Sequence, residues 1–249
     1  MRRYVEDGFV DRIRAAGGEV YAITSEPQHL ADQAQNHWAL TFTSIGDPHQ
    51  EIARTCSERD WLTLYANRGR LTFLQRGANW RVEHPKGYFQ PGVLALTGAG
   101  RILYRWRSVP SAANLNGTLA RPTPEHVWGA VEAALEADEG AADAAHDDNP
   151  VVDSTPPPRA LFVAALIANG WFLGVKAFAY SPGVGSVPSR FAAALSRWLL
   201  FLGAWIAAFF LLPTLPVALA LAGWIIWITY DVRHTLGAMD QQQELTEQG

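Results

Sequence analysis

One stretch of this sequence, from Ser154 to Tyr230, contains no aspartate or glutamate over 77 consecutive residues. Its only charged residues are Arg159, Lys176, Arg190 and Arg197. A water-exposed domain surface needs carboxylates, whereas every charge placed in bilayer hydrocarbon is costly. The stretch therefore predicts a membrane-embedded region. The alternative is a buried helical hairpin of a soluble protein, and the missing acids weigh against it.

Two segments of this stretch have the composition of transmembrane helices. The first covers residues 191–212 and the second covers 216–230, with the helix breaker Pro213-Thr214-Leu215-Pro216 between them. At about 1.5 Å per residue, the first segment is long enough for a hydrocarbon core of about 30 Å, and the second is short. We therefore expect a helical hairpin whose partner is the lipid bilayer.

The basic residues indicate how this hairpin is oriented. Arg190 precedes the first span, Arg197 lies early in it, Arg233 and His234 follow the second span, and the turn has no basic residue. The positive-inside rule then puts both ends in the cytoplasm. Aromatic residues typical of an interfacial belt lie toward the same ends: Trp198, Trp224, Trp227 and Tyr230. No apolar signal-peptide core follows the start "MRRYVEDGFV", so we expect the soluble part on the cytoplasmic side of the cell membrane.

A third apolar stretch, residues 160–180, allows two interpretations. Sixteen uncharged residues precede Lys176, but Asn169-Gly170 interrupts them. The stretch is either a third span or a helix lying in the interface, and the interfacial interpretation agrees better with the charge rule. The membrane region is thus placed at 159–235, followed by a polar tail over 236–249.

The remaining sequence divides by charge into a neutral part and an acidic one. Residues 1–138 hold 15 Lys and Arg against 15 Asp and Glu, whereas 139–158 hold five acids and no Lys or Arg. The second segment is rich in Ala and Pro, which predicts a linker. The net charge of −4 argues against nucleic acid as a partner, because such binding relies on neutralising phosphates.

Residues 1–138 predict an α/β layered fold. We expect Ser25 and Thr123 to cap helices, and Val127, Val131 and Leu135 to form the apolar face of the last helix. The expected elements are a helix over 4–16, a strand over 19–24, a helix over 27–37, an extended run over 39–47, a helix over 50–59, a strand near 71–74, a hairpin of 92–98 with 101–107, and a helix over 124–137.

Short patterns within residues 1–137 resemble the peroxiredoxin-like, or alkyl hydroperoxide reductase/thiol-specific antioxidant, family. They are the strand "EVYAIT", the segment "FTSIGDP" and the hairpin "QPGVLALTGAGRILYRW". The resemblance implies a three-layer thioredoxin-like domain in which the proline before the hairpin, Pro91, is cis and faces a redox cysteine. It also implies thiol-dependent oxidoreductase or peroxidase (antioxidant) activity, with thiol- or disulfide-bearing proteins as partners.

The redox centre that this resemblance implies is missing from the sequence. In that family a strand and a reactive cysteine precede the first long helix, whose N-terminus lowers the thiol pKa. Here the matching helix begins at about residues 1–4, so the domain is expected to lack its first strand and to hold no catalytic residue. Direct pairing of 19–24 with 92–97 would close the resulting gap. Two hypotheses stay open: an incomplete membrane-anchored thiol oxidoreductase, and a non-enzymatic membrane-tethered interaction module.

Cys56 is the only thiol, and it lies inside the expected helix 50–59. Arg54 and Arg59 flank it and would lower its pKa, but we favour the interpretation of a small packed residue. The seven histidines have no metal-ligand spacing, and they are expected on the surface or in turns. No nucleotide-binding or nucleophile motif is present, so neither a metal nor a cofactor is expected.

Overall fold

The protein is described by a computed structural model that covers residues 5–78, 81–117, 121–138, 140–152, 154–178 and 186–246. The expected helix start at residues 1–4 and the last three residues of the polar tail lie outside the described residues. The chain divides into two compact units. Unit 1 comprises residues 1–68, 83–156 and 241–249, and unit 2 comprises 69–82 and 157–240. The segment 69–82 therefore folds with the apolar helices, and the tail folds with the α/β unit.

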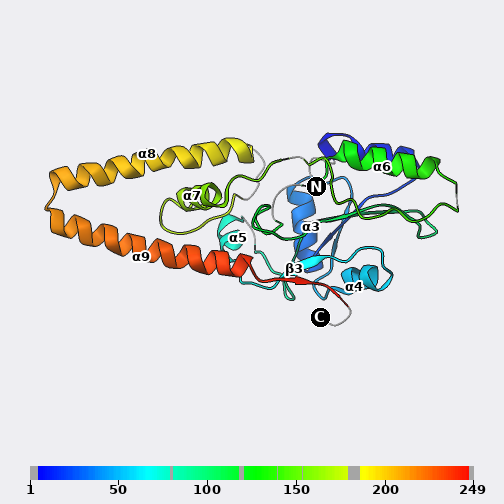
Figure 1. The fold of residues 1–249 in the computed structure, drawn as a ribbon, viewed down its shortest axis with the longest axis horizontal. Coiled ribbons are helices and arrows are strands. Elements are labelled where there is room, and N and C mark those ends of the chain that lie inside the picture. Colours follow the sequence, from blue (N-terminus) through cyan, green and yellow to red (C-terminus); the bar gives the residue numbers. More distant parts are fainter. Residues whose placement is uncertain are drawn as a thin grey trace. The chain divides into compact units, whose positions relative to one another are not determined.

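The described strands of unit 1 form three small sheets (Figure 1). β1 (Tyr21–Thr24) pairs in parallel with β2 (Thr43–Gly46), and β5 (Gly92–Leu96) pairs antiparallel with β6 (Ile102–Arg107). β3 (Tyr65–Asn67) lies between β4 (Tyr88–Phe89) and β7 (Gln242–Glu244), antiparallel to both. The α/β class and the hairpin are confirmed, while the thioredoxin-like arrangement stays a prediction.

The direct pairing of 19–24 with 92–97, the alternative that would close the gap left by a missing strand, is not observed. Among the described residues, β1 pairs only with β2, and β5 pairs only with β6. α2 (Phe9–Ala15) contributes to the core of both sheets: Phe9 packs in the cluster of Trp106, and Val10 packs in the cluster of Phe42. One helix thus joins two sheets that each keep an unpaired strand edge.

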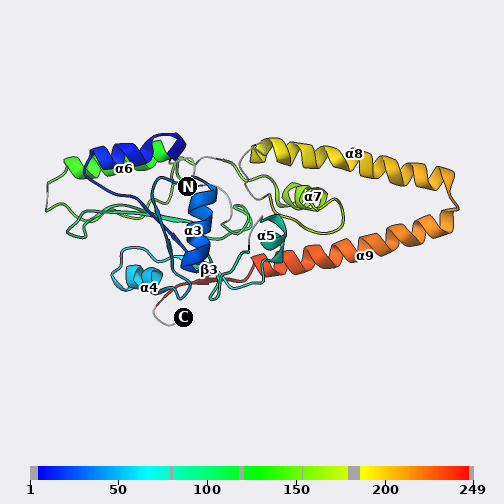
Figure 2. The same cartoon turned by 180° about the vertical axis from the view of Figure 1, so that it is seen from behind.

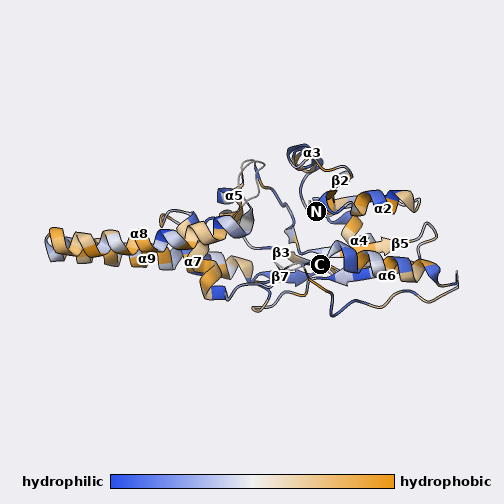
Figure 3. Ribbon diagram, turned by 90° about the horizontal axis from the view of Figure 1, so that it is seen from above, coloured by the Kyte–Doolittle hydropathy of each residue, from blue (hydrophilic) through white to orange (hydrophobic). Residues whose placement is uncertain are grey.

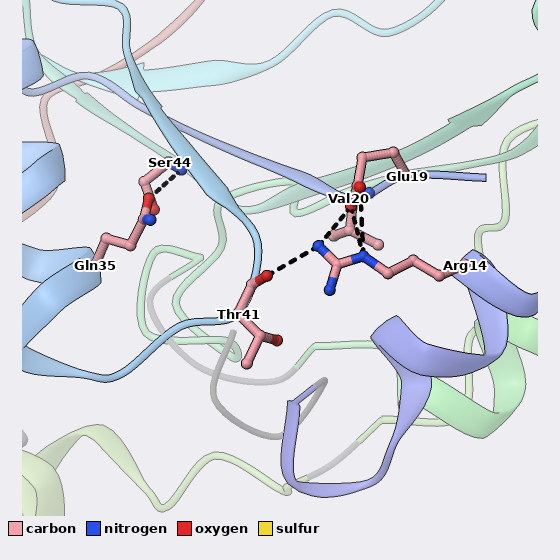
Figure 4. Close-up of polar contacts among 6 residues, drawn as sticks. All are labelled: Arg14, Glu19, Val20, Gln35, Thr41 and Ser44. Atoms are coloured by element: carbon pink, nitrogen blue, oxygen red, sulfur yellow. Dashed lines mark hydrogen bonds and ion pairs between the residues drawn. The ribbon is translucent and has the colours of Figure 1, made fainter.

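Polar contacts fix α2 and α3 (Gln28–His37) to β1 and β2 (Figure 4). The Arg14 guanidinium donates to the Glu19 carboxylate at 2.9 Å and to the Thr41 carbonyl at 2.9 Å. The Gln35 side-chain oxygen accepts from the Ser44 backbone N–H at 2.7 Å. The bonds to Thr41 and Ser44 use backbone groups just before β2 and within it, so they attach α2 and α3 to this strand.

The cap predicted at Ser25 is wrong. α3 follows Pro27 without a side-chain cap, because the Ser25 hydroxyl accepts instead from the Phe89 backbone N–H at 3.1 Å. α4 (Glu51–Glu58) agrees with its expected helix, and Asp47 caps it by accepting from two of its N–H groups at 2.7 and 3.0 Å.

The last helix of unit 1, α6 (Pro124–Glu136), confirms the cap predicted at Thr123, whose hydroxyl accepts from the backbone N–H three residues later at 3.3 Å. Val127 and Val131 of its apolar face are buried. Leu135 was expected beside them, but 48% of it is exposed, because it lies one residue before the end of the helix.

The acidic segment 139–158 differs from a free linker over its described residues. The Ala144 and Asp147 N–H groups donate to carbonyls of β6, each at 3.0 Å. The Asp147 carboxylate accepts from the Tyr104 hydroxyl at 2.9 Å and lies 2.7 Å from His126 Nε2. The segment therefore covers the outer edge of β6, and the free edge of this sheet belongs to β5.

Unit 2 contains α5 (Thr72–Gly77), α7 (Arg159–Asn169), α8 (Val187–Leu211) and α9 (Thr214–Met239). The strand expected near 71–74 is wrong: Phe73 is a buried residue of α5, and it packs in the apolar core of this unit. α8 and α9 run antiparallel and meet at a short turn, as the expected hairpin does (Figures 1 and 2).

The apolar helices differ in length from the expected ones. α9 continues past residue 230 to Met239, so Arg233 and His234 lie within the helix. α7 has 11 residues, or about 16 Å, which is too short for a third span across a core of about 30 Å. The stretch 160–180 thus forms a short helix followed by a turn, and its last two residues lie outside the described residues.

Candidate functional site

The family resemblance puts a reactive thiol just before the helix expected over residues 4–16, at a position that lies outside the described residues. Within them, α2 begins after Gly8, which has a left-handed φ of 66° and makes no side-chain cap bond. The one cysteine of the sequence, Cys56, lies on α4.

Cys56 is half-buried on α4, and its surroundings hold it as a thiol. Burial raises the pKa of this thiol, and the Asp47 carboxylate raises it further. The prediction that Arg54 and Arg59 lower the pKa of Cys56 is wrong. Of the two, only Arg59 lowers this pKa, and burial raises it by more. Arg54 donates to two backbone carbonyls before α4, at 3.0 and 3.3 Å. Since the thiolate is the nucleophile, a raised pKa makes Cys56 a weak one.

Pro91 lies directly before β5, at the position that the resemblance assigns to it. Its peptide bond with Gln90 is trans, so the expected cis geometry is not observed. The Pro91 carbonyl accepts from the Ser108 N–H at 2.9 Å, which extends the β5–β6 ladder by one bond. Pro91 thus begins the hairpin, and no thiol of the described residues is placed against it.

The end of β1 carries a buried polar cluster that the sequence analysis did not find. Ser25 is 3% exposed, and its hydroxyl lies 2.9 Å from Nδ1 of His84. Burial lowers the pKa of His84 to about 4, so its ring is neutral at pH 7. Burial also raises the pKa of the neighbouring Glu26 to about 7. The turn signal His84-Pro85-Lys86-Gly87 was visible in the sequence, but its contact with Ser25 was not.

Unit 2 holds a second polar centre, formed around the first carboxylate after the acid-free stretch. The Asp231 carboxylate on α9 accepts from the Arg76 guanidinium at 2.7 and 3.1 Å and from the Val175 N–H at 2.6 Å. The Asp231 side chain is 12% exposed and that of Arg76 is 44% exposed. This bidentate pair ties α5 and the turn after α7 to α9, so its role is structural.

The base of the α8–α9 hairpin is an aromatic cluster. The Phe172 ring stacks on Phe201 with centroids 3.9 Å apart, and Trp198 meets Phe172 edge-on at 4.9 Å. The indole N–H groups of Trp198 and Trp224 donate to carbonyls of α7 and the turn after it, at 3.1 and 2.8 Å. The tryptophans expected in an interfacial belt therefore also clamp the α7 segment onto the hairpin.

Beyond this base, α8 and α9 leave apolar side chains exposed along most of their length. The ribbon of both helices is coloured mostly as hydrophobic in Figure 3. Leu199, Phe210 and Ile226 are 75%, 85% and 72% exposed. Both helices are long enough and apolar enough to span a membrane, over Pro188–Leu211 and Thr214–Met239. These features favour association of unit 2 with a lipid bilayer.

No group of three His, Cys, Asp or Glu side chains within the part of the chain that the structure describes is arranged to hold a metal ion. Comparison of the chain with models of known families, with curated proteins and with solved structures finds no match.

Proposed function

We propose that this chain is a membrane-tethered, redoxin-like module that works by binding and not by thiol chemistry. The observation that carries the proposal is the row of exposed apolar side chains on α8 and α9, two helices that are long enough and apolar enough to span a membrane. A soluble monomer rarely exposes so large an apolar patch, whereas bilayer hydrocarbon accommodates two helices whose backbone bonds are internal. Extraction of cell membranes with alkaline carbonate tests this anchoring: the full chain is expected in the pellet, and its release into the supernatant would refute it.

The orientation that we propose puts both ends of the hairpin, and with them unit 1, on the cytoplasmic side of the cell membrane. Arg190 lies near the start of α8, Arg197 lies in its first half, Arg233 lies in the last two turns of α9, and the turn between the helices has no basic residue. The positive-inside rule supports this orientation.

The chemistry of Cys56 supports binding over catalysis. A half-buried thiol with a raised pKa gives little thiolate at neutral pH, and no second cysteine of this sequence can resolve an oxidised one. We expect the full chain in detergent micelles to consume peroxide in the presence of dithiothreitol no faster than micelles alone. Turnover that Cys56→Ser abolishes would contradict the proposal, and the same variant is the control for adventitious thiol oxidation.

A second candidate function, a membrane-anchored thiol oxidoreductase, is favoured by the edges of β1 and β5 that no other described strand pairs with. α2 packs on both sheets, and a strand bearing a thiol at its end would fit the pattern of the peroxiredoxin-like family. The DNA upstream of the Met1 codon separates the two proposals. An in-frame strand pattern that ends in a cysteine codon favours the oxidoreductase, and a stop codon close upstream eliminates it.

A further inference from the structure

A cavity of unit 1 has walls that are strongly basic. Its volume is about 420 Å³, within the range of about 300–1,000 Å³ that small-molecule sites occupy. Three separate parts of the chain meet there: α4 with the residue before it, the residue after β3, and the turn after residue 83. The lining residues are Gln50, Arg54, Arg68, His84, Pro85, Lys86 and Gly87.

The three cations of this cavity have no carboxylate partner among the described residues. Arg54 donates only to neutral backbone carbonyls, and the Arg68 and Lys86 side chains have no recorded ion pair. No aspartate or glutamate lines the cavity. Like charges around one hollow repel each other, and an anion bound between them removes that repulsion.

The backbone around the cavity is fixed before any ligand arrives. The Gln50 side-chain amide donates to the Lys86 carbonyl at 2.8 Å, and the Gly87 N–H donates to the His84 carbonyl at 3.1 Å. Gly87 has a φ of 112°, where a side chain would be strained, and a Cβ there would meet the Asn67 carbonyl oxygen at 2.7 Å. The turn that carries Lys86 is therefore held in place, and little ordering is needed on binding.

His84 ties the wall of the cavity to the end of β1. The Ser25 hydroxyl accepts from the Phe89 N–H at 3.1 Å and lies 2.9 Å from Nδ1 of His84. Burial lowers the pKa of His84 to about 4, so the ring adds no charge to the cavity at pH 7. The positive charge of the walls therefore comes from Arg54, Arg68 and Lys86.

We propose that this cavity binds a phosphate group, with Arg54, Arg68 and Lys86 as its cationic ligands. Three cations match a phosphate dianion better than a single carboxylate, and guanidinium groups bind phosphate oxygens in pairs. The group belongs either to a small phosphorylated molecule or to a phospholipid headgroup. The site goes beyond the proposed membrane tether and does not depend on it, because all its residues belong to unit 1.

The test is a titration of the full chain with inorganic phosphate, in nanodiscs of phosphatidylcholine and at constant ionic strength set with chloride. We expect saturable binding by calorimetry in the parent protein. Arg68→Gln and Lys86→Gln should each weaken binding about tenfold, because each removes one charged hydrogen bond. Lys86→Arg should retain it. The matched control is Arg59→Gln, which removes a cation of the same region that lies over the Trp61 ring at 4.8 Å and does not line the cavity.

Nanodiscs that contain phosphatidic acid distinguish the two sources of phosphate. Weaker apparent binding of inorganic phosphate in these discs indicates that a headgroup occupies the cavity, and unchanged binding indicates a small phosphorylated molecule. The proposal is overturned if the parent shows no saturable binding, or if Arg68→Gln and Lys86→Gln bind phosphate as tightly as Arg59→Gln does. Neither outcome bears on membrane anchoring, which the carbonate extraction tests separately.

Discussion

Replacing Asp231 by asparagine is expected to loosen the attachment of α5 and the turn after α7 to α9. The variant keeps the shape of the side chain but removes the charge that accepts two bonds from Arg76 and one from Val175. Hydrogen bonds to charged groups contribute about 1.5–3 kcal/mol each, and breaking a fully buried pair costs about 3–5 kcal/mol. Arg76 is 44% exposed, so water compensates part of the loss. We therefore expect a cost of about 2–3 kcal/mol.

Amide hydrogen exchange of the full chain in nanodiscs measures this cost, because the Val175 N–H is itself one of the donors to Asp231. A loss of about 2–3 kcal/mol corresponds to exchange about 30- to 140-fold faster in the peptide that contains Val175. The matched control is Arg159→Gln, which removes an exposed pair with Asp240 in the same unit. Arg159→Gln should lower the free energy of local opening by less than about 1 kcal/mol. Equal protection in Asp231→Asn and Arg159→Gln would refute the reasoning.

Two further predictions concern unit 1. Burial raises the pKa of Glu26 to about 7, so the folded state keeps a proton on this carboxyl that the unfolded state loses above about pH 4.5. The contribution of Glu26 to the free energy of unfolding therefore becomes less favourable as the pH rises from about 4.5 to 7. In denaturant unfolding, Glu26→Gln should therefore stabilise unit 1 by about 2 kcal/mol relative to the parent at pH 8 and show no gain at pH 4. An equal change in the free energy of unfolding at both pH values would contradict this prediction. Val127→Ala should lower the free energy of unfolding by about 2–3 kcal/mol, because Val127 is 2% exposed. Leu135 lies on the same helix but is 48% exposed, so Leu135→Ala should cost less than about 1 kcal/mol. Equal shifts of the melting temperature in the two variants would contradict the burial argument.

Local patterns predicted the elements whose stability is local. The helix over 124–137 and its Thr123 cap follow from a capping residue, a proline and apolar spacing, all of which lie within one segment. The hairpin around residue 99 follows in the same way from two extended runs and a glycine turn.

Tertiary contacts decided the features that the sequence did not predict. Leu71 to Leu74 is a short apolar run that suits a strand or a helix, and packing of Phe73 in the core of unit 2 selects the helix α5. Ser25 has the composition of a cap, but its hydroxyl is used by Phe89, 64 residues away. The candidate phosphate cavity joins residues from 50 to 87, and no spacing rule brings those side chains together.

The most direct test of the membrane-tether account is labelling with a membrane-impermeant maleimide in sealed vesicles of known orientation. In a Cys56→Ser background, Thr214→Cys places a single thiol at the turn between α8 and α9, and Thr246→Cys places one in the tail; both positions are exposed. The account predicts that the turn is labelled only from the outer face of the membrane and the tail only from the cytoplasmic face. Labelling of both positions from the same face would contradict a hairpin that spans the bilayer.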